Sequence, residues 1–320
     1  MRAAVVTDLI GPDGVVVREV PTPTPGPAQV LIDVEYAGIS FPDVLQTRGE
    51  YQVRPELPFT PGWEISGVVR AASGSFRAGE RVAAMPFGGG VAESVAVDTS
   101  YVFPLPESVS SDAAAALPLN YLTAHFALVR RANLQRGETV LVQGAGGGVG
   151  SASCNMAAAL GAKVIAVVSS TEKATVAEAA GAHHVVLADG FLAKVRELTE
   201  GRGVDVVVDP VGGERFTDSL RSLAREGRLL VVGFTGGQIP TAKTSRLLLT
   251  NTTVIGAGTR ELWNHEPEMP RRQWDDLLPL LKSGALKPVI GQQFSLEQTS
   301  TAIRTIEGRL AAGKVLVRVR

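Results

Sequence analysis

One stretch of the sequence restricts the fold more than any other: an apolar run that breaks into a cluster of glycines. Residues 139–142 have the composition of a buried strand, glycines follow between positions 144 and 150, and an alanine-rich helical segment continues to about residue 160. Glycine lacks a Cβ atom, so the backbone turns sharply here and comes close to a bound group. A helix N-terminus offers its N–H groups to phosphates. Strand, glycine turn and helix in this order predict a pyrophosphate site.

The glycine spacing alone is weak evidence. Gly144, Gly147 and Gly150 stand three residues apart, which is not the usual dinucleotide spacing and also fits an ordinary strand-to-helix turn. The flanking sequence favours the nucleotide site. Four more short β-branched runs follow, separated by helical stretches, at residues 163–168, 204–208, 228–232 and 253–255. This alternation indicates βαβ units, an α/β fold and a parallel sheet buried on both faces.

The first 120 residues have a different pattern. Short strand-like runs separated by turn signals recur at 3–7, 14–19, 29–36, 65–69, 81–84 and 91–97. They predict a β-rich domain of barrel or folded-sheet type. The last sixty residues are too few to stand alone and are expected to rejoin it. We therefore expect one domain from residues 1–121 and 258–320, with a nucleotide-binding domain of residues 122–257 inserted. Within the last part, 259–272 is polar and predicts a loop or lid, with a helix at 273–282.

Composition excludes several classes of protein. A length of 320 residues suggests two domains. The formal net charge is -1 with no basic block, which argues against a nucleic-acid partner. No apolar run is long enough to span a bilayer, and the N-terminus opens into a strand-like run, so a cytoplasmic protein without a membrane partner is expected. The single cysteine, Cys154, excludes an intramolecular disulfide and a cysteine-built zinc site.

Taken together and in order, seven segments resemble the zinc-free quinone oxidoreductases of the medium-chain dehydrogenase/reductase superfamily. The segments are residues 38–45, 51–64, 117–124, 144–150, 209–213, 231–234 and 313–314. The resemblance covers nearly the whole chain. It implies a GroES-like folded barrel joined to a Rossmann domain, a doubly wound parallel sheet, with the active site in a cleft.

The resemblance also implies a reaction without metal. Zinc-dependent relatives hold their catalytic ion with a cysteine where Ser40 stands and a histidine where Trp63 stands, and their four-cysteine structural lobe is absent here. Without a Lewis acid, hydride transfer to an activated acceptor remains feasible. Ser40, Asp43, Tyr51 and Trp63 are the expected substrate-cleft residues. Many family members have asparagine at Ser40 and tyrosine at Leu45, so contacts made by those groups are not transferred, and no catalytic residue is assigned.

The expected cofactor residues fall into three groups. Gly144, Gly146, Gly147, Gly148, Val149 and Gly150 form the pyrophosphate turn, while Gly233 and Phe234 follow a strand at the end where the cofactor runs. The resemblance adds Asn120 and Thr123 near the nicotinamide, where helix capping or packing are equally open explanations. Lys314 and Arg260 are weaker candidates, indicated mainly by their position.

The end of the second strand decides the cofactor. NAD-binding proteins place an acid there to accept from the ribose 2′-OH, whereas this chain has Ser169 and Ser170. Lys173 is positioned in sequence to meet a 2′-phosphate, so NADPH is expected. The alternative is that both serines only cap the next helix.

These features lead to one main hypothesis and two rivals. The main one is a metal-free NADPH-dependent oxidoreductase that transfers hydride from nicotinamide C4 to a quinone. An enone or enoyl-thioester reductase on the same scaffold is the first rival, and a nucleotide-binding sensor with little turnover is the second. The last strand of the parallel sheet, residues 253–256, is expected at its edge, where it invites pairing with another chain. A homodimer is therefore expected.

Overall fold

The computed structural model describes residues 1–71 and 74–320, and the chain forms two compact units. The β-rich unit comprises Met1–Leu119, Pro267–Lys282 and Ile290–Arg320, and the nucleotide unit comprises Asn120–Glu266 and Ser283–Val289. GroES-like and Rossmann-type folds are thus both present in one α/β chain, as the sequence predicts. The division differs from the expected boundaries because residues 258–266 and 283–289 lie with the nucleotide unit. Asn155 ties the second segment there, since its amide bonds the Ala285 carbonyl at 3.2 Å and the Lys287 N–H at 2.8 Å.

Antiparallel strands dominate the β-rich unit. The residues that the structure describes form a seven-stranded sheet of order β14-β15-β3-β4-β5-β7, with β6 pairing β3, and β1 pairs β2 separately. The strands are β1 (Arg2–Val6), β2 (Val15–Glu19), β3 (Gln29–Ile39), β4 (Glu64–Val69), β5 (Arg81–Ala84), β6 (Ser94–Asp98), β7 (Val102–Pro104), β14 (Ile290–Ser295) and β15 (Lys314–Arg318). The helices are α1 (Phe41–Thr47), α2 (Ser111–Ala114), α10 (Met269–Lys282) and α11 (Thr299–Glu307).

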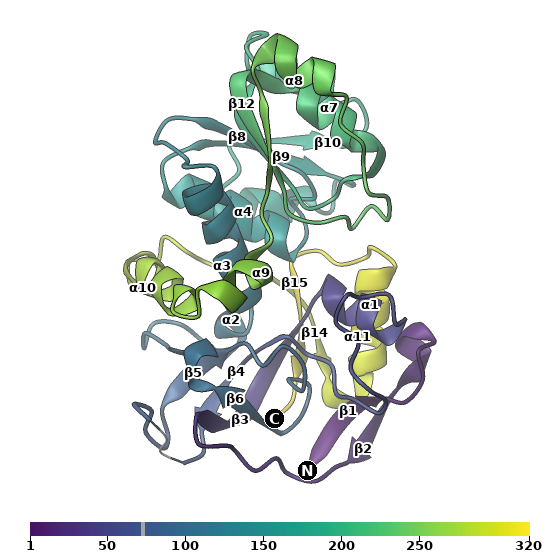
Figure 1. The fold of residues 1–320 in the computed structure, drawn as a ribbon, viewed down its shortest axis with the longest axis vertical. Helices are drawn as coiled ribbons and strands as arrows, with labels where there is room; N and C mark the ends of the chain where they lie inside the picture. The colour runs from purple at the N-terminus through teal and green to yellow at the C-terminus, as the bar shows by residue number, and fades with distance from the viewer. Residues whose placement is uncertain (72–73) are drawn as a thin grey trace. The chain divides into compact units, whose positions relative to one another are not determined.

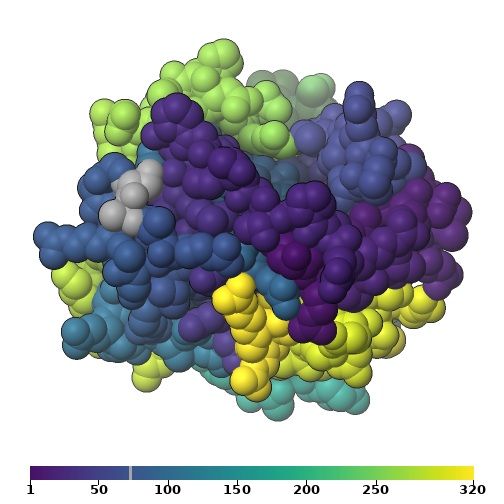
Figure 2. Space-filling model, turned by 90° about the horizontal axis from the view of Figure 1, so that it is seen from below, coloured from purple at the N-terminus to yellow at the C-terminus, as the bar shows by residue number. Residues whose placement is uncertain are grey.

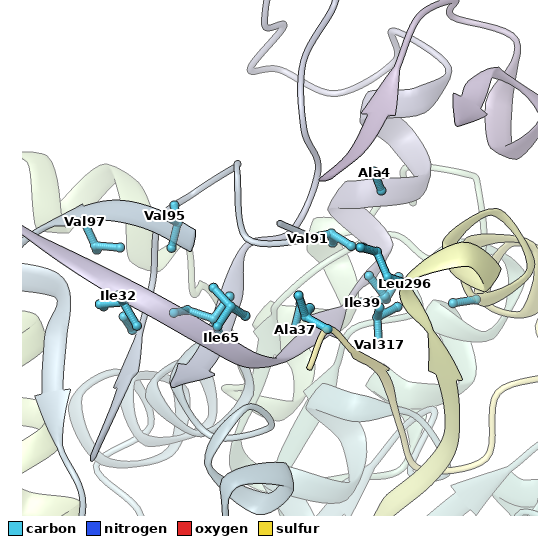
Figure 3. Close-up of a cluster of buried hydrophobic side chains, with 14 of the residues drawn as sticks. Ala4, Ile32, Ala37, Ile39, Ile65, Val91, Val95, Val97, Leu296 and Val317 are labelled. Carbon is cyan, nitrogen blue, oxygen red and sulfur yellow. The ribbon is translucent and has the colours of Figure 1, made fainter. Parts of the chain in front are cut away.

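Alternation along β3 builds the core of this unit. Val30, Ile32 and Val34 are fully buried, as expected for a strand with one apolar face. Figure 3 shows side chains from β3, β4, β6 and β15 gathered in one apolar cluster. β15 pairs with β3 over Tyr36 to Ile39, so the last strand of the chain completes a sheet begun near its first residues.

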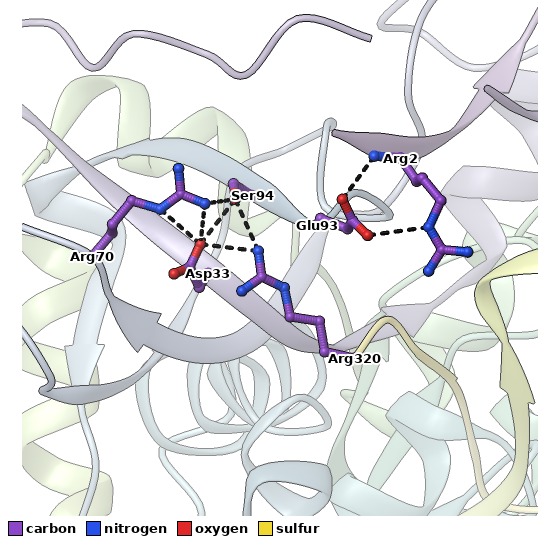
Figure 4. A network of polar contacts seen from close by, with 6 residues as sticks. All are labelled: Arg2, Asp33, Arg70, Glu93, Ser94 and Arg320. Atoms are coloured by element: carbon purple, nitrogen blue, oxygen red, sulfur yellow. Dashed lines mark hydrogen bonds and ion pairs between the residues drawn. The ribbon is translucent and has the colours of Figure 1, made fainter. Parts of the chain in front are cut away.

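A polar network on the surface of this sheet includes the last residue of the chain. The carboxylate of Asp33 accepts from Arg70 at 2.5 Å and from Arg320 at 3.2 Å, and Ser94 bonds the same oxygen (Figure 4). In Figure 2 the last residues, in yellow, lie against the first residues, in purple. Exposed ion pairs of this kind add little stability, so we regard them as positioning the C-terminal strand.

The nucleotide unit is built on a parallel sheet. Its described strands pair in the order β10-β9-β8-β11-β12-β13, all in parallel (Figure 1). They are β8 (Thr139–Val142), β9 (Lys163–Val168), β10 (His184–Leu187), β11 (Val204–Asp209), β12 (Leu223–Val231) and β13 (Thr253–Gly256). The strand order reverses between β8 and β11, and in open parallel sheets ligands bind at the carboxyl ends beside such a reversal. The glycine turn follows β8, so it lies at that point.

Helices connect the parallel strands. They are α4 (Gly148–Ala159), α5 (Ala174–Ala179), α6 (Phe191–Leu198), α7 (Phe216–Arg221), α8 (Thr244–Thr250) and α9 (Thr259–His265). α3 (Pro118–His125) leads into the unit and continues as a π-helical turn, Phe126–Arg131. None of the helices formed by residues 1–71 and 74–320 has the length and apolarity needed to cross a bilayer.

The prediction of a loop or lid at 259–272 is wrong. α9 occupies Thr259–His265 and α10 begins at Met269, four residues before the expected helix start. The helical pattern is weak in the sequence because few apolar residues hold these two helices to the core. Trp263 of α9 and Trp274 of α10 are both buried, and the Trp274 ring stacks on Phe103 with 4.8 Å between ring centroids. Pro270 lies in the first turn of α10, where its missing N–H costs nothing.

Candidate functional site

The glycine turn after β8 is packed too tightly for side chains at two positions. Gly144 has φ +61°, a left-handed conformation, and a Cβ on Gly150 would lie 2.1 Å from the Gly144 carbonyl oxygen. Glycine at these two positions therefore allows the start of α4 to lie directly against the end of β8. Gly147 caps α4 and no side chain hydrogen-bonds there. The helix N-terminus is therefore presented by bare backbone, which is what a pyrophosphate requires.

Three neighbouring strand ends meet beside this turn. The Gln143 N–H bonds the Val208 carbonyl at 2.9 Å, which joins the end of β8 to β11. A Cβ on Gly144 would lie 3.0 Å from the Val211 side chain, and one on Gly212 would lie 3.0 Å from the Phe234 ring. The structure thus brings Phe234, which is partly exposed, to the same edge of the sheet as the glycines. Gly233 precedes it, two residues after β12 ends at Val231.

Asp209 shapes the loop that follows β11. One of its carboxylate oxygens accepts the N–H groups of Val211 and Gly212 at 2.9 and 2.8 Å. Burial raises the pKa of this carboxyl. Its other oxygen is buried and has no hydrogen-bond partner among the described residues. From the sequence, this segment was predicted as the turn after the strand at 204–208 and as one of the segments that carry the family resemblance.

At the end of β9 the structure places Lys173 over the glycine turn. A Cβ on Gly146 would lie 2.7 Å from the Lys173 Cβ, so the lysine stem crosses the turn itself. Ser169 is exposed, whereas the Ser170 hydroxyl bonds the Glu172 carboxylate and holds its pKa below the ordinary range. The alternative that the serines cap the next helix is wrong, because α5 begins after Lys173 without a side-chain cap.

Asn120 is the residue of α3 that reaches the glycine turn. It is buried, and its Oδ1 lies 3.0 Å from where a Cβ on Gly148 would stand. Thr123, one turn later on α3, is buried as well. Glycine at position 148 therefore leaves room for the Asn120 amide beside the first turn of α4. Both residues belong to the nucleotide unit with the glycines.

The β-rich unit contains a buried group of charges that the sequence did not reveal. Lys314 Nζ lies 2.5 Å from Glu64 Oε1 and donates to Ser40 Oγ at 2.6 Å. The second oxygen of Glu64 accepts the Leu119 N–H at 2.9 Å. A Cβ on Gly38 would lie 2.7 Å from Glu64 Cγ and 2.8 Å from Lys314 Cε, so glycine makes the space for this pair. Lys314 was expected at the cofactor, and in the structure its ammonium bonds Glu64 and Ser40.

Asp43 supports the same region through the backbone. It forms a capping box with Ser40 at the start of α1, and its two oxygens accept the N–H groups of Ser40 and Gly62, each at 2.8 Å. The side chain is fully buried, and burial raises its pKa to about 6. Its partners are both donors, so Asp43 fixes the loop around Gly62 rather than facing a ligand freely.

Aromatic side chains surround the position of Trp63. Its ring is buried, its Nε1 donates to Gln46 Oε1 at 2.9 Å, and it meets Tyr51 edge to face at 5.2 Å. Phe87 lies 5.7 Å from Trp63 and 4.8 Å from Tyr101, again edge to face. Phe87 has φ +57°, which is strained for a bulky residue. Tyr51, Phe87 and Tyr101 are partly exposed, so the wall they form presents an aromatic surface.

Sequence reasoning missed Glu64, Gln46 and Phe87. Ser40 and Lys314 stand 274 residues apart, and no local pattern announces a pair at that separation. Gly38 was the one indication in the sequence, because a glycine inside a strand often marks a place where another group lies close to the backbone. Within residues 1–71 and 74–320, no three histidine, cysteine, aspartate or glutamate side chains are grouped as a metal site requires.

Comparison with known proteins agrees with this geometry. Residues 26–107 match the family described as alcohol dehydrogenase GroES-like domain, and residues 148–283 match the one described as zinc-binding dehydrogenase. The chain is 40% identical to quinone oxidoreductase-like protein 2 of Bos taurus, over 100% of this chain and 93% of the relative. It is 31% identical to the quinone oxidoreductase of Homo sapiens, over 99% of this chain and 97% of that protein.

Solved structures of oxidoreductases are also similar to this chain over its full length. The quinone oxidoreductase of Thermus thermophilus, also solved as a complex with NADPH, superposes with a TM-score of 0.86 at 35% identity, covering 100% of both chains. A probable oxidoreductase from Mycobacterium abscessus gives 0.92 at 40% identity, covering 100% of this chain and 99% of that one. With the GroES-like and Rossmann folds, the glycine turn and full-length relatives in agreement, this chain belongs to the quinone oxidoreductase family of the medium-chain dehydrogenase/reductase superfamily.

Proposed function

We propose that this protein is a metal-free NADPH-dependent reductase whose acceptor is a quinone. The observation that carries the proposal is the turn of Gly144 to Gly150, which has no room for a side chain at Gly150, with the stem of Lys173 lying across Gly146. In relatives of known structure an NADPH complex is described for the Thermus thermophilus enzyme.

The nucleotide unit supplies the groups that would hold the cofactor. The backbone of residues 144–150 would suit a pyrophosphate, because glycine at position 150 lets the start of α4 lie directly against the end of β8 and no side chain bonds the N-terminus of that helix. Lys173 would meet the 2′-phosphate, with Ser169 as a second donor. Asn120 and Thr123 would orient the nicotinamide end. When bound, a reduced nicotinamide supplies a hydride, and the protein's task is to position the acceptor and exclude competing reactions.

The β-rich unit supplies the acceptor side of the proposal. Positions 40 and 63 carry a serine and a tryptophan, and neither is a good ligand for zinc. A quinone brings its own electrophilicity, so it needs orientation more than a Lewis acid. The partly exposed rings of Tyr51 and Phe87 suit a flat aromatic acceptor.

Cofactor choice gives the sharpest test of the nucleotide site. A charge-assisted hydrogen bond is worth on the order of 1.5–3 kcal/mol, or roughly a tenfold to hundredfold preference. Lys173→Ala should weaken NADPH binding by about that factor and leave NADH nearly unchanged, and Ser169→Asp should reverse the preference. Calorimetric Kd values for both cofactors measure this. Lys194→Ala, which removes an exposed lysine paired with Glu197, is the matched control.

Acceptor identity requires a separate experiment. NADPH oxidation should proceed with ortho- and para-quinones and should survive chelation. Loss of activity with a chelator and recovery with zinc would refute the metal-free proposal. Turnover of α,β-unsaturated ketones or acyl-thioesters, with none of quinones, would favour the enone reductase. Tight NADPH binding with no turnover of any acceptor would favour the nucleotide-binding sensor.

We also propose that the protein is a homodimer formed through the nucleotide unit. β13 lies at the edge of the parallel sheet, as expected from the sequence. The neighbouring segment leaves three apolar side chains mostly in solvent: Ile239, Leu248 and Leu249 are 77–78% exposed. An unpaired strand edge beside exposed leucines suits a second copy related by a two-fold axis.

A further inference from the structure

The buried group of Lys314, Glu64 and Ser40 is the least expected feature of the β-rich unit. The side chains of Lys314 and Glu64 are 4% and 0% exposed. Taking two charges out of water costs several kcal/mol per ion, and a pair of apolar residues would often be at least as stable. The pair also requires glycine at position 38, because a side chain there would occupy the space of Glu64 and Lys314. Fold stability alone therefore gives a poor account of this arrangement.

Hydrogen-bond directions in the group point toward Ser40. An ammonium is a donor only, so the 2.6 Å contact to Ser40 Oγ uses the serine oxygen as acceptor. The Ser40 hydroxyl proton then points to Glu64 Oε1 over a long 3.4 Å. That proton is thus only weakly engaged by an acceptor, while the serine oxygen accepts a short hydrogen bond from a charged donor. Ser40 is also the least buried of the three, at 9% exposed.

We propose that Ser40 donates a proton to the reduced acceptor and that Lys314 replaces it. The inference rests on the proposed function, which leaves an anionic oxygen on the acceptor after it receives a hydride from NADPH. The Ser40 O–H bond breaks as a proton moves to that oxygen, and an N–H bond of Lys314 breaks as Ser40 regains its proton. Lys314 is left as a neutral amine beside the Glu64 carboxylate, and water returns the missing proton. Ser40 is the catalytic residue here, and Lys314 and Glu64 are positioning residues.

The test compares two quinones of similar shape whose products differ in basicity. The quinol of tetrafluoro-1,4-benzoquinone is acidic, so reduction of this quinone should not depend on a proton donor. The quinol of tetramethyl-1,4-benzoquinone is much less acidic, so reduction of that quinone should depend on one. General acid catalysis contributes roughly 10²–10⁴-fold. In Ser40→Ala, kcat with the tetramethyl acceptor should fall by about 100-fold or more, and kcat with the tetrafluoro acceptor should stay close to wild type. Ser66→Ala, which removes a buried serine hydroxyl bonded to the Ser111 carbonyl, should change neither.

The paired variant Lys314→Met with Glu64→Gln removes both charges without leaving one unpaired. It should show the same selective loss, and thermal unfolding should confirm that it folds. Binding of 4-nitrophenol provides a readout that does not depend on turnover. A Ser40 donor should lower the apparent pKa of the bound phenol relative to that in Ser40→Ala, which the absorbance of the phenolate reports.

Each outcome decides one of the two proposals. An equal fall with both quinones in Ser40→Ala, or an unchanged pKa of bound nitrophenol, would overturn the proton donor while quinone reduction stands. If the wild type reduces neither quinone, the proposed acceptor is wrong, and the nitrophenol titration still decides whether Ser40 donates.

Discussion

At the scale of single residues, burial decides the chemistry of Asp43. Its ordinary pKa of 3.8 rises to about 6, chiefly because burial penalises the charged form. A raised pKa in the folded state means that the folded protein binds the proton more tightly. The stabilising contribution is therefore complete below pH 3.8 and is lost as the pH rises through about 6. The shift of about two units corresponds to about 3 kcal/mol.

Asp43→Asn removes this titration and should be less stable, because the asparagine NH₂ would face one of two backbone N–H donors. The free energy of unfolding of the wild type relative to Asp43→Asn should increase as the pH falls from about 7 to 4. Urea unfolding of both proteins over this range measures the difference. A difference that decreases toward acid pH would show that Asp43 is stabilised as a carboxylate.

At the scale of elements, the contact of α4 with the end of β8 depends on Gly150. In Gly150→Ala the new Cβ would lie 2.1 Å from the Gly144 oxygen, so the helix must shift away from the strand. Overpacking of this kind costs typically about 1–3 kcal/mol, and NADPH binding should weaken with it. Gly258→Ala is the matched control, because nothing lies within 4 Å of its Cβ and its φ is -81°. Equal Tm and NADPH Kd for the two variants would argue against the tight turn.

At the scale of the whole molecule, the proposed homodimer follows from the edge strand β13 and helix α8. Static light scattering at micromolar concentration should give twice the monomer mass. Leu248→Asp together with Leu249→Asp should give a monomer, because burying two carboxylates against a second copy is costly. Leu310→Asp is the control, since Leu310 is comparably exposed in the β-rich unit. A wild-type monomer would reject the proposal, and an unaffected double variant would place the interface elsewhere.

Local sequence patterns predicted much of the fold. β8 and β9 were predicted to the residue, because each is a short apolar run rich in β-branched residues, with glycine or serine one or two residues after its end. The edge position of β13 followed from strand order alone. Helix α9 was not predicted, because its seven residues bury only Trp263 and show no clear apolar stripe.

The sequence by itself determined the glycine turn between β8 and α4, because strand, glycines and helix are contiguous and their geometry follows from missing Cβ atoms. It also gave positions 40 and 63 a serine and a tryptophan, neither of which is a good ligand for zinc. Only the tertiary structure decided the partners of Lys314, since Glu64 and Ser40 reach it from far away in the chain. Likewise, only the fold laid Lys173 across Gly146. Such contacts depend on how sheets and loops pack, and packing energy depends on neighbours in space that no local pattern records.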